Sequence, residues 1–267
     1  MQVTEIHATA IVDKNAKLGA GVSIGAYSII GPKVTLGDGC SVGPHVVIEG
    51  NTTIGKNNRF FQFSSVGAIP QDLKFHGEDS KLIMGDNNVV RECATLHLGT
   101  ENGGMVTQVG SNNLFMAYTH VAHDCKVGNS NIFANSATLA GHVEITDHVI
   151  LGGLSAVHQF VRIGEYAILS GGAMTGKDVP NYCIAQGNHA TLRGINIIAL
   201  QRNGFSEEDI ALIRKVYRAL FRKVGNMEKK IAELSDDVKA NARIASWFEF
   251  IRSSERGLLY DSHGEAE

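Results

Sequence analysis

The fold is decided by residues 18–43, LGAGVSIGAYSIIGPKVTLGDGCSVG, in which an aliphatic residue returns at every sixth position and is followed by Gly. The same register continues to Val66-Gly67, resumes at Met84-Gly85 and, after a second break, runs from Val109 to Leu169. A period of six fits neither an amphipathic helix nor a hairpin strand, but it is typical of a solenoid that repeats a short strand and a corner. The sequence therefore predicts an all-β parallel β-helix, with the aliphatic side chains inside and each Gly in a tight bend that disfavours a Cβ.

Two segments interrupt the repeat. Residues 68–82 (AIPQDLKFHGEDSKL) and residues 99–108 (GTENGGMVTQ) stand between otherwise regular repeats. Insertions in a solenoid become loops that project from one face, and this is commonly the binding face. We therefore expect both insertions to lie near a functional site.

The C-terminal part of the chain has a helical pattern. The repeat stops at about residue 186, and Ser206 followed by three acidic residues reads as a helix N-cap. Apolar residues then follow at helical spacing: Ile210, Ile213, Val216, Tyr217, Leu220 and Phe221. Further apolar positions between Met227 and Ile251 indicate two or three more helices. We divide the chain into a β-helix (1–186) and an α-helical cap (187–267), which serves either as an end-cap and oligomer contact or in substrate binding.

Composition excludes several classes of function. The formal net charge is −3, and the basic residues are scattered, so nothing predicts binding to nucleic acid or to an anionic membrane. No apolar run approaches the roughly 20 residues that span a bilayer. The four cysteines lie far apart without a CxxC pair, and the N-terminus lacks the basic and apolar regions of a signal peptide. We expect a reduced, cytoplasmic protein without a transmembrane segment, to which any lipid must come on a soluble carrier.

Folding the repeat brings histidines together. If a coil contains three repeats, the repeats that begin at Val121, Leu139 and Val157 stack on successive coils and carry His123, His142 and His158. Stacked strands lie roughly 4.8 Å apart, so the three imidazoles should fall within about 10 Å along the axis. His120 ends the preceding repeat and should lie at the adjacent corner. This clustering predicts a functional site, although each histidine alone is more typical of a surface residue.

Asp124, beside His123, is a candidate for the carboxylate that orients the imidazole and raises its basicity. Adjacency in the sequence is weak support, because neighbouring strand residues point to opposite faces. Cys125 falls at the small-residue position of the repeat, which predicts burial rather than a nucleophilic role.

Five stretches resemble one family. They are GAIPQDLKFHG (67–77), THVAHDCKVGN (119–129), NSATLAGHVEI (135–145), AVHQFVRIG (156–164) and AQGNHATLRGIN (185–196). They are similar to the UDP-N-acetylglucosamine 3-O-acyltransferases, which catalyse the first step of lipid A (lipopolysaccharide) biosynthesis. The resemblance covers essentially the whole chain, and it implies a left-handed β-helix with 18-residue coils, a triangular prism that assembles as a homotrimer with its sites between subunits.

The resemblance implies transfer of an (R)-3-hydroxyacyl group from acyl carrier protein to the 3-position of UDP-N-acetylglucosamine, without a cofactor or a metal. His123 would be the general base, Asp124 would orient it, and the N–H of Gly141 would stabilise the oxyanion. Transfer would be direct, because no Ser or Cys stands beside the base as a nucleophile.

The remaining site residues are also carried over from the family. Gln71, Asp72 and His120 match positions that contact the sugar and the acyl group. Six others match positions around the nucleotide, its phosphates and the carrier arm: Lys74, His142, His158, Gln159, Asn196 and Arg202. Gly171, with Gly172, lies where the acyl chain should run, and the missing side chains favour a longer 3-hydroxyacyl group.

The segment after GNHAT departs from the family pattern. Ile198 stands in place of an acidic residue, and Arg202 is followed by Asn203 rather than by a second Arg. The nucleotide contacts can therefore differ, which leaves open an acceptor with an amine in place of the 3-hydroxyl and an amide product.

Three other functions remain as alternatives. Hexapeptide β-helices include zinc-dependent carbonic anhydrases, and His120-x-x-His123 resembles ligand spacing. Residues three apart on a strand face opposite sides, however, which argues against a shared metal. The related N-acyltransferase of the same pathway carries an extra N-terminal domain, for which repeats that begin by about residue 12 leave no room. In a non-catalytic scaffold, the clustered histidines would be incidental.

Overall fold

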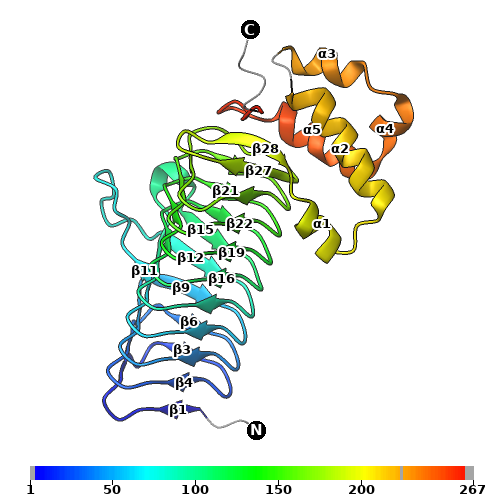
Figure 1. The fold of residues 1–267 in the computed structure, drawn as a ribbon. Coiled ribbons are helices and arrows are strands. Elements are labelled where there is room, and N and C mark those ends of the chain that lie inside the picture. The colour runs from blue at the N-terminus through cyan, green and yellow to red at the C-terminus, as the bar shows by residue number, and fades with distance from the viewer. Residues whose placement is uncertain (1–3, 223–224, 262–267) are drawn as a thin grey trace.

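The computed structural model describes residues 4–222 and 225–261. In Figure 1 the chain climbs through a tall stack of coils, and helices pack at the far end of the stack. Each regular coil contributes one short strand to each of three parallel sheets, which we call A, B and C. Paired strands such as β5 and β8 match residues 18 apart, Ile29 with Val47, so the period of six seen in the sequence is one third of a coil.

The strand bounds follow the sheets. Sheet A contains β1 (Glu5–Ile6), β4 (Ser23–Ile24), β7 (Ser41–Val42), β10 (Arg59–Phe60), β13 (Val89–Val90), β16 (Leu114–Phe115), β19 (Ile132–Phe133), β22 (Ile150–Leu151), β25 (Ile168–Leu169), β27 (Cys183–Gln186) and β28 (Thr191–Ile195). Sheet B contains β2 (Ile11–Val12), β5 (Ile29–Ile30), β8 (Val47–Ile48), β11 (Ser65–Ala68), β14 (Thr95–His97), β17 (His120–Val121), β20 (Thr138–Leu139), β23 (Ala156–Val157) and β26 (Met174–Thr175). Sheet C contains β3 (Lys17–Leu18), β6 (Thr35–Leu36), β9 (Asn51–Ile54), β12 (Lys81–Met84), β15 (Val106–Val109), β18 (Lys126–Val127), β21 (Glu144–Ile145) and β24 (Arg162–Ile163).

The aliphatic residue of each repeat points inward, as predicted. Ile30, Leu36, Ile48 and Leu139 are at most 1% exposed, and they belong to one continuous core that also includes the cap. Burial of such side chains stabilises a fold by about 1.5–3 kcal/mol each. The regular period therefore supplies the core that holds successive coils together.

The expected role of the glycines is only partly right. Most of the tight bends are made by non-glycine residues with positive φ, such as Tyr27 (58°) and His45 (57°), although Gly21 and Gly39 form two of them. Gly19 and Gly25 instead lie where the next coil approaches closely, since an added Cβ would be 2.6 Å from the Asp38 backbone N and 2.7 Å from the Gly43 carbonyl carbon. At these positions the repeat keeps Gly because of coil-to-coil packing, not because of backbone conformation.

Both insertions leave the prism at the same corner. We call the turn between a sheet B strand and the following sheet C strand the B–C corner. The first insertion lies between β11 and β12, and the second, which includes the 3-10 helix η1 (Glu101–Gly103), lies between β14 and β15. In Figure 1 the first insertion projects from the stack as a cyan loop. The backbone N–H of Glu101 donates to Glu78 Oε1 at 3.1 Å, so the two insertions touch.

The C-terminal part begins with a strand that the helical pattern did not predict. β28 pairs antiparallel with β27, and the helices follow it. They are α1 (Ile197–Arg202), α2 (Glu207–Phe221), α3 (Met227–Ala232), α4 (Asp236–Ala240) and α5 (Ala242–Arg252). Ser206 caps α2 as predicted, because its side chain accepts from the Asp209 N–H. None of the helices among the described residues has the length and apolarity needed to cross a membrane.

Arg162 of β24 fastens the helices to the β-helix. Its guanidinium donates to the Phe250 carbonyl at 2.6 Å and to Ser253 Oγ at 2.9 Å, and it lies 4.3 Å from the centre of the Phe250 ring. Its Nε also lies 3.4 Å from the buried Asp178 carboxylate. These contacts fix the end of α5 beside sheet C.

Candidate active site

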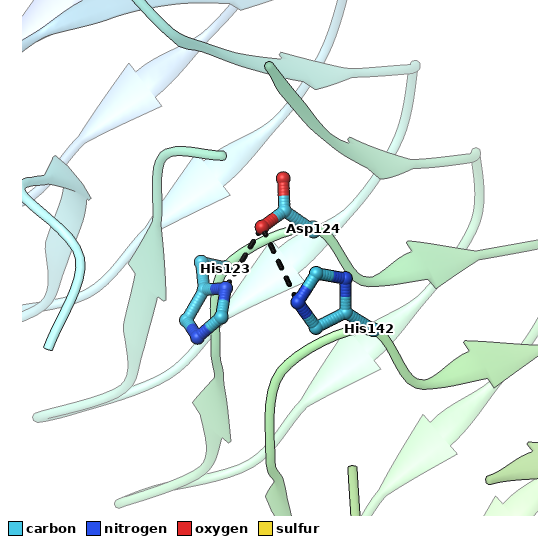
Figure 2. A group of neighbouring side chains, drawn as sticks. All are labelled: His123, Asp124 and His142. Carbon is cyan, nitrogen blue, oxygen red and sulfur yellow. Dashed lines mark hydrogen bonds and ion pairs between the residues drawn. The ribbon is translucent and has the colours of Figure 1, made fainter. Parts of the chain in front are cut away.

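The B–C corner of successive coils carries the candidate catalytic group. His123 and Asp124 form the turn between β17 and β18, and Gly141 and His142 form the same turn one coil later. Asp124 adopts a φ of 60°, a conformation that Asp tolerates better than most residues. Because this turn is not extended, the two neighbouring side chains converge instead of pointing to opposite faces (Figure 2). His123 Nδ1 lies 2.8 Å from Asp124 Oδ2.

The second insertion holds the Asp124 carboxylate. The Thr100 backbone N–H donates to Oδ1 at 2.8 Å, and the Thr100 hydroxyl donates to Oδ2 at 2.6 Å. The Asp124 N–H in turn donates to Thr107 Oγ1 at 2.8 Å. Gly103 packs so closely that an added Cβ would be 1.9 Å from the carboxylate carbon. The insertion therefore fixes both the position and the orientation of the carboxylate.

The environment keeps Asp124 ionised. Burial works against the charged form, but the hydrogen bonds from His123 and Thr100 outweigh it and lower the pKa of the Asp124 carboxyl. With its Nδ1 hydrogen directed at this carboxylate, neutral His123 has Nε2 free to accept a proton. The pair is thus arranged as a carboxylate-oriented general base.

Gly141 lies directly beside the His123 ring. An added Cβ at position 141 would be 2.5 Å from His123 Cε1 and 2.6 Å from Nε2. The Gly141 carbonyl accepts from the Phe160 N–H at 3.2 Å, whereas the Gly141 N–H donates to no acceptor in residues 4–222 and 225–261. A backbone donor without a partner beside the base has the character of an oxyanion-binding group.

His142 completes the cluster from the next coil. Its ring meets His123 edge-on at a centroid distance of 5.1 Å and stacks on Phe160 at 4.4 Å. Burial lowers the pKa of His142, while the charges of Asp124 and Asp72 act in the opposite direction. The effect of Asp72 links the first insertion electrostatically to this cluster. Gln71 and Lys74 are exposed on the same insertion.

Two further histidines, His97 and His120, lie next to each other near the base. The sequence pattern predicts a role for His120 but not for His97. His120 belongs to strand β17, not to a corner as expected, and its Nδ1 lies 2.7 Å from Thr95 Oγ1. His97 meets it edge-on at 4.9 Å, is 5% exposed and has no hydrogen-bond partner for Nδ1 among the described atoms. Burial lowers the pKa of His97 to about 4 and also lowers the pKa of His120. The second insertion lengthens the spacing between β14 and β17 to 25 residues, Thr95 with His120, so only a register carried across the insertion places His97 beside His120.

His158 does not join the cluster as expected. Val157 pairs with Leu139, so His158 occupies the coil position of Ala140, one residue before the position of Gly141. Its Nδ1 lies 3.4 Å from Arg256 Nη2, and it lines a groove of about 450 Å³ with Ala140 and Met174. Gln159, at the coil position of Gly141, is exposed.

Three other expected site residues lie at different corners. Gly171 lies in the turn between sheets A and B, after β25. Asn196 lies by the corner between sheets C and A, where its amide donates to the Tyr166 carbonyl at 2.9 Å and its oxygen caps α1. Arg202 is exposed at the end of α1. Within one protomer, the residues expected to contact the substrates therefore lie along all three edges of the prism.

The cluster also has the spacing of a metal site. Ligand atoms of His123, Asp124 and His142 all lie within 4.8 Å of one another. This set differs from the His120 and His123 pair considered from the sequence. A metal would have to replace the hydrogen bond between His123 and Asp124, so the geometry favours a general base over a metal ligand at His123.

Cys125 is buried, as the repeat predicts. Full burial raises the pKa of its thiol to about 12 and makes it a poor nucleophile.

Comparison with known proteins shows the family of this chain. A family model described as UDP N-acetylglucosamine O-acyltransferase, domain 2, matches residues 178–259. The acyl-[acyl-carrier-protein]--UDP-N-acetylglucosamine O-acyltransferase of Aliarcobacter butzleri is 52% identical over 97% of this chain and 99% of its own length. This chain belongs to the UDP-N-acetylglucosamine O-acyltransferase family. The enzyme of the same name from Myxococcus xanthus is 51% identical over 96% of the chain and 99% of that protein.

Solved structures of the family agree in fold. The UDP-N-acetylglucosamine acyltransferase of Francisella novicida superposes with a TM-score of 0.92 at 39% identity, covering 96% of this chain and 94% of that one. The predicted left-handed parallel β-helix with a helical C-terminal region is thus confirmed, as is the family resemblance. The matches do not favour the carbonic anhydrase or the amide-forming alternative.

Proposed function

We propose that this family member transfers a 3-hydroxyacyl group from acyl carrier protein to the 3-hydroxyl of UDP-N-acetylglucosamine, with His123 as the general base. The observation that carries this proposal is the hydrogen bond of 2.8 Å between His123 Nδ1 and Asp124 Oδ2, which leaves Nε2 free beside Gly141. An acyltransferase of this kind needs a base and an oxyanion donor within reach of one carbonyl carbon. Both groups occur side by side at the B–C corner.

The proposed reaction has two steps. His123 Nε2 takes the proton of the sugar 3-hydroxyl as the oxygen attacks the thioester carbon, and the Gly141 N–H donates to the resulting oxyanion. The tetrahedral intermediate then collapses, the carbon–sulfur bond breaks, and the His123 imidazolium returns the proton to the carrier thiolate. Asp124 stays ionised and stabilises the imidazolium. Lowered pKa values keep His120 and His142 neutral near pH 7, so they do not repel this charge.

The substrates need more than one protomer. The base and both insertions occupy the B–C corner, whereas Gly171, Asn196 and Arg202 lie at the other two corners. A homotrimer in which neighbouring edges face each other would bring these groups into one site and would turn a shallow edge into a deep cleft. Gln71, Asp72 and His120 would then contact the sugar and acyl group. Lys74, His142, His158 and Gln159 would contact the nucleotide, its phosphates and the carrier arm.

We also place the enzyme in the cytoplasm. Cys40, Cys93, Cys125 and Cys183 are all free, which is typical of a reducing compartment.

Product analysis tests the function directly. Purified protein is incubated with UDP-N-acetylglucosamine and a panel of 3-hydroxyacyl carrier proteins, and the product is analysed by mass spectrometry. We expect an ester at the 3-position, with a preference for a longer acyl chain if Gly171 borders the acyl path. The variant His123→Ala should abolish transfer while the melting temperature stays within a few degrees. Near-normal turnover by this variant would rule out His123 as the base.

A further inference from the structure

Arg256 and Lys177 lie by two grooves that meet at Gly176, and among the described residues neither cation has an acidic partner. The first groove is lined by Ala140, His158, Gly176 and His189, among others. A second groove, of about 460 Å³, continues from the same Gly176 and His189 along Lys177, Thr191 and Tyr260. Among the residues that the structure describes, no acidic side chain lines either groove.

Arg256 reaches the junction of the grooves from the segment that follows α5. Its Nη2 donates to the Gly176 carbonyl at 3.2 Å and lies 3.4 Å from His158 Nδ1, and its Nε lies 3.3 Å from the same carbonyl. Neither partner is a carboxylate. Within residues 4–222 and 225–261 neither Arg256 nor Lys177 forms an ion pair. Both side chains are exposed at this end of the prism.

Two other arginines at this end of the chain's fold contrast with Arg256. Arg252, at the end of α5, donates to the Glu228 carboxylate at 2.9 Å, and Arg162 of β24 contacts Asp178. A guanidinium that is held in place by a carbonyl and a ring, and not by a carboxylate, keeps its charge available for a ligand. The ligand that fits has an apolar or uncharged body for the groove and an anionic group at its end.

We propose that Arg256 and Lys177 form a phosphate-binding site for a substrate of the proposed transfer reaction. Two phosphate groups have the required chemistry: the phosphodiester of the carrier's pantetheine arm and the diphosphate of the sugar nucleotide. Arg256 binds two phosphate oxygens with its planar fork, and Lys177 supplies a point charge on the other side of Gly176. The inference rests on the proposed function, but binding of the isolated ligands tests it separately.

The test measures binding of 4′-phosphopantetheine and of UDP to the full-length protein by calorimetry. The variants are Arg256→Ala, Arg256→Lys, Lys177→Ala and, as the matched control, Arg252→Ala. Arg256→Ala should weaken one ligand roughly tenfold, the effect of one charged hydrogen bond, and Arg256→Lys should recover part of the loss. Weaker phosphopantetheine binding assigns the site to the carrier arm, and weaker UDP binding assigns it to the nucleotide.

Turnover separates this inference from the proposed function. The same variants should raise KM for the assigned substrate and leave kcat within about twofold, because the phosphate does not change between ground and transition state. Unchanged binding of both ligands by Arg256→Ala, or an equal loss in Arg252→Ala, would overturn the inference while the proposed transfer stands. A wild-type protein that binds these ligands but forms no acyl product would instead contradict the proposed function.

Discussion

The His123 ring lies against the α-carbon of Gly141, so closely that the site has no space for a Cβ at position 141. Residues 123 and 141 are 18 apart, the length of one coil, and their contact follows from the register of β17 and β20. The solenoid thus places a side chain from one coil and a bare peptide from the next around the same point. A base and an oxyanion donor come together without any loop having to close.

The variant Gly141→Ala should inactivate the enzyme without unfolding it. The new Cβ would displace the imidazole by more than a few tenths of an ångström, and a misplacement of about 1 Å can cost roughly 100-fold in rate. We expect kcat to fall by about that factor, measured with saturating substrates, while the melting temperature changes little. Gly153→Ala is the control, because its Cβ would have no neighbour closer than 3.4 Å. Equal kcat values for the two variants would contradict the assignment of Gly141.

The variant Thr100→Val should slow the reaction from outside the substrate contacts. Valine keeps the shape and the backbone donor of Thr100 but removes the hydroxyl that donates to Asp124 Oδ2. Loss of one hydrogen bond to a charged group should lower kcat roughly tenfold. Because that bond helps to lower the pKa of Asp124, the acid limb of the kcat profile should also move to higher pH. Thr100→Ser should restore both properties; a pH profile that stays in place would limit Thr100 to a structural role.

Histidine burial should make the stability of the protein depend on pH. The pKa of His97 is about 4 in the folded state, against about 6.5 in an unfolded chain. The unfolded state therefore binds more protons between these values, so stability is complete above about pH 6.5 and falls as the pH drops toward 4. From pH 7 to pH 5 the loss should be about 2 kcal/mol per protomer.

Urea unfolding at the two pH values checks this prediction. The variant His97→Gln, which cannot titrate, should lose less stability between pH 7 and pH 5 than the wild type. His7→Gln alters an exposed histidine and should keep the wild-type dependence. If His97→Gln and the wild type showed the same difference, the buried ring would not be the cause.

The sequence predicts the parts of this site that depend on the unbroken repeat. His123, Gly141 and His142 stand on consecutive coils, so the period of six is enough to bring them together. His97 is missed because β14 pairs with β17 at a spacing of 25 residues, Thr95 with His120, and the second insertion supplies the difference. The convergence of His123 and Asp124 depends on the positive φ of Asp124, which no hydrophobic pattern reveals. His158 does not join the cluster because it lies at the coil position of Ala140, one residue before that of Gly141. At this position its side chain lines another groove.

The sequence does not predict that a strand, β28, precedes the first helix of the C-terminal part. β28 carries Thr191, Leu192 and Ile195, a pattern too short to distinguish a strand from the start of a helix. Its strand character depends on pairing with β27, a tertiary contact. The sequence does predict the long helix α2, because its N-cap and its buried face are both local signals.

Mixed trimers should recover activity that neither parent variant has. His123 lies at the B–C corner and Arg202 at the end of α1, so in the proposed homotrimer one site takes these two residues from different protomers. His123→Ala and Arg202→Ala should each have little activity alone. When the two chains are co-expressed in equal amounts, about one site in four pairs an intact His123 with an intact Arg202 and should turn over normally. The measurement compares the kcat of the mixed preparation with that of each parent, at a particle mass verified by light scattering. Activity no higher than the parents' average would show that both residues act within one protomer, because only then does mixing create no intact site.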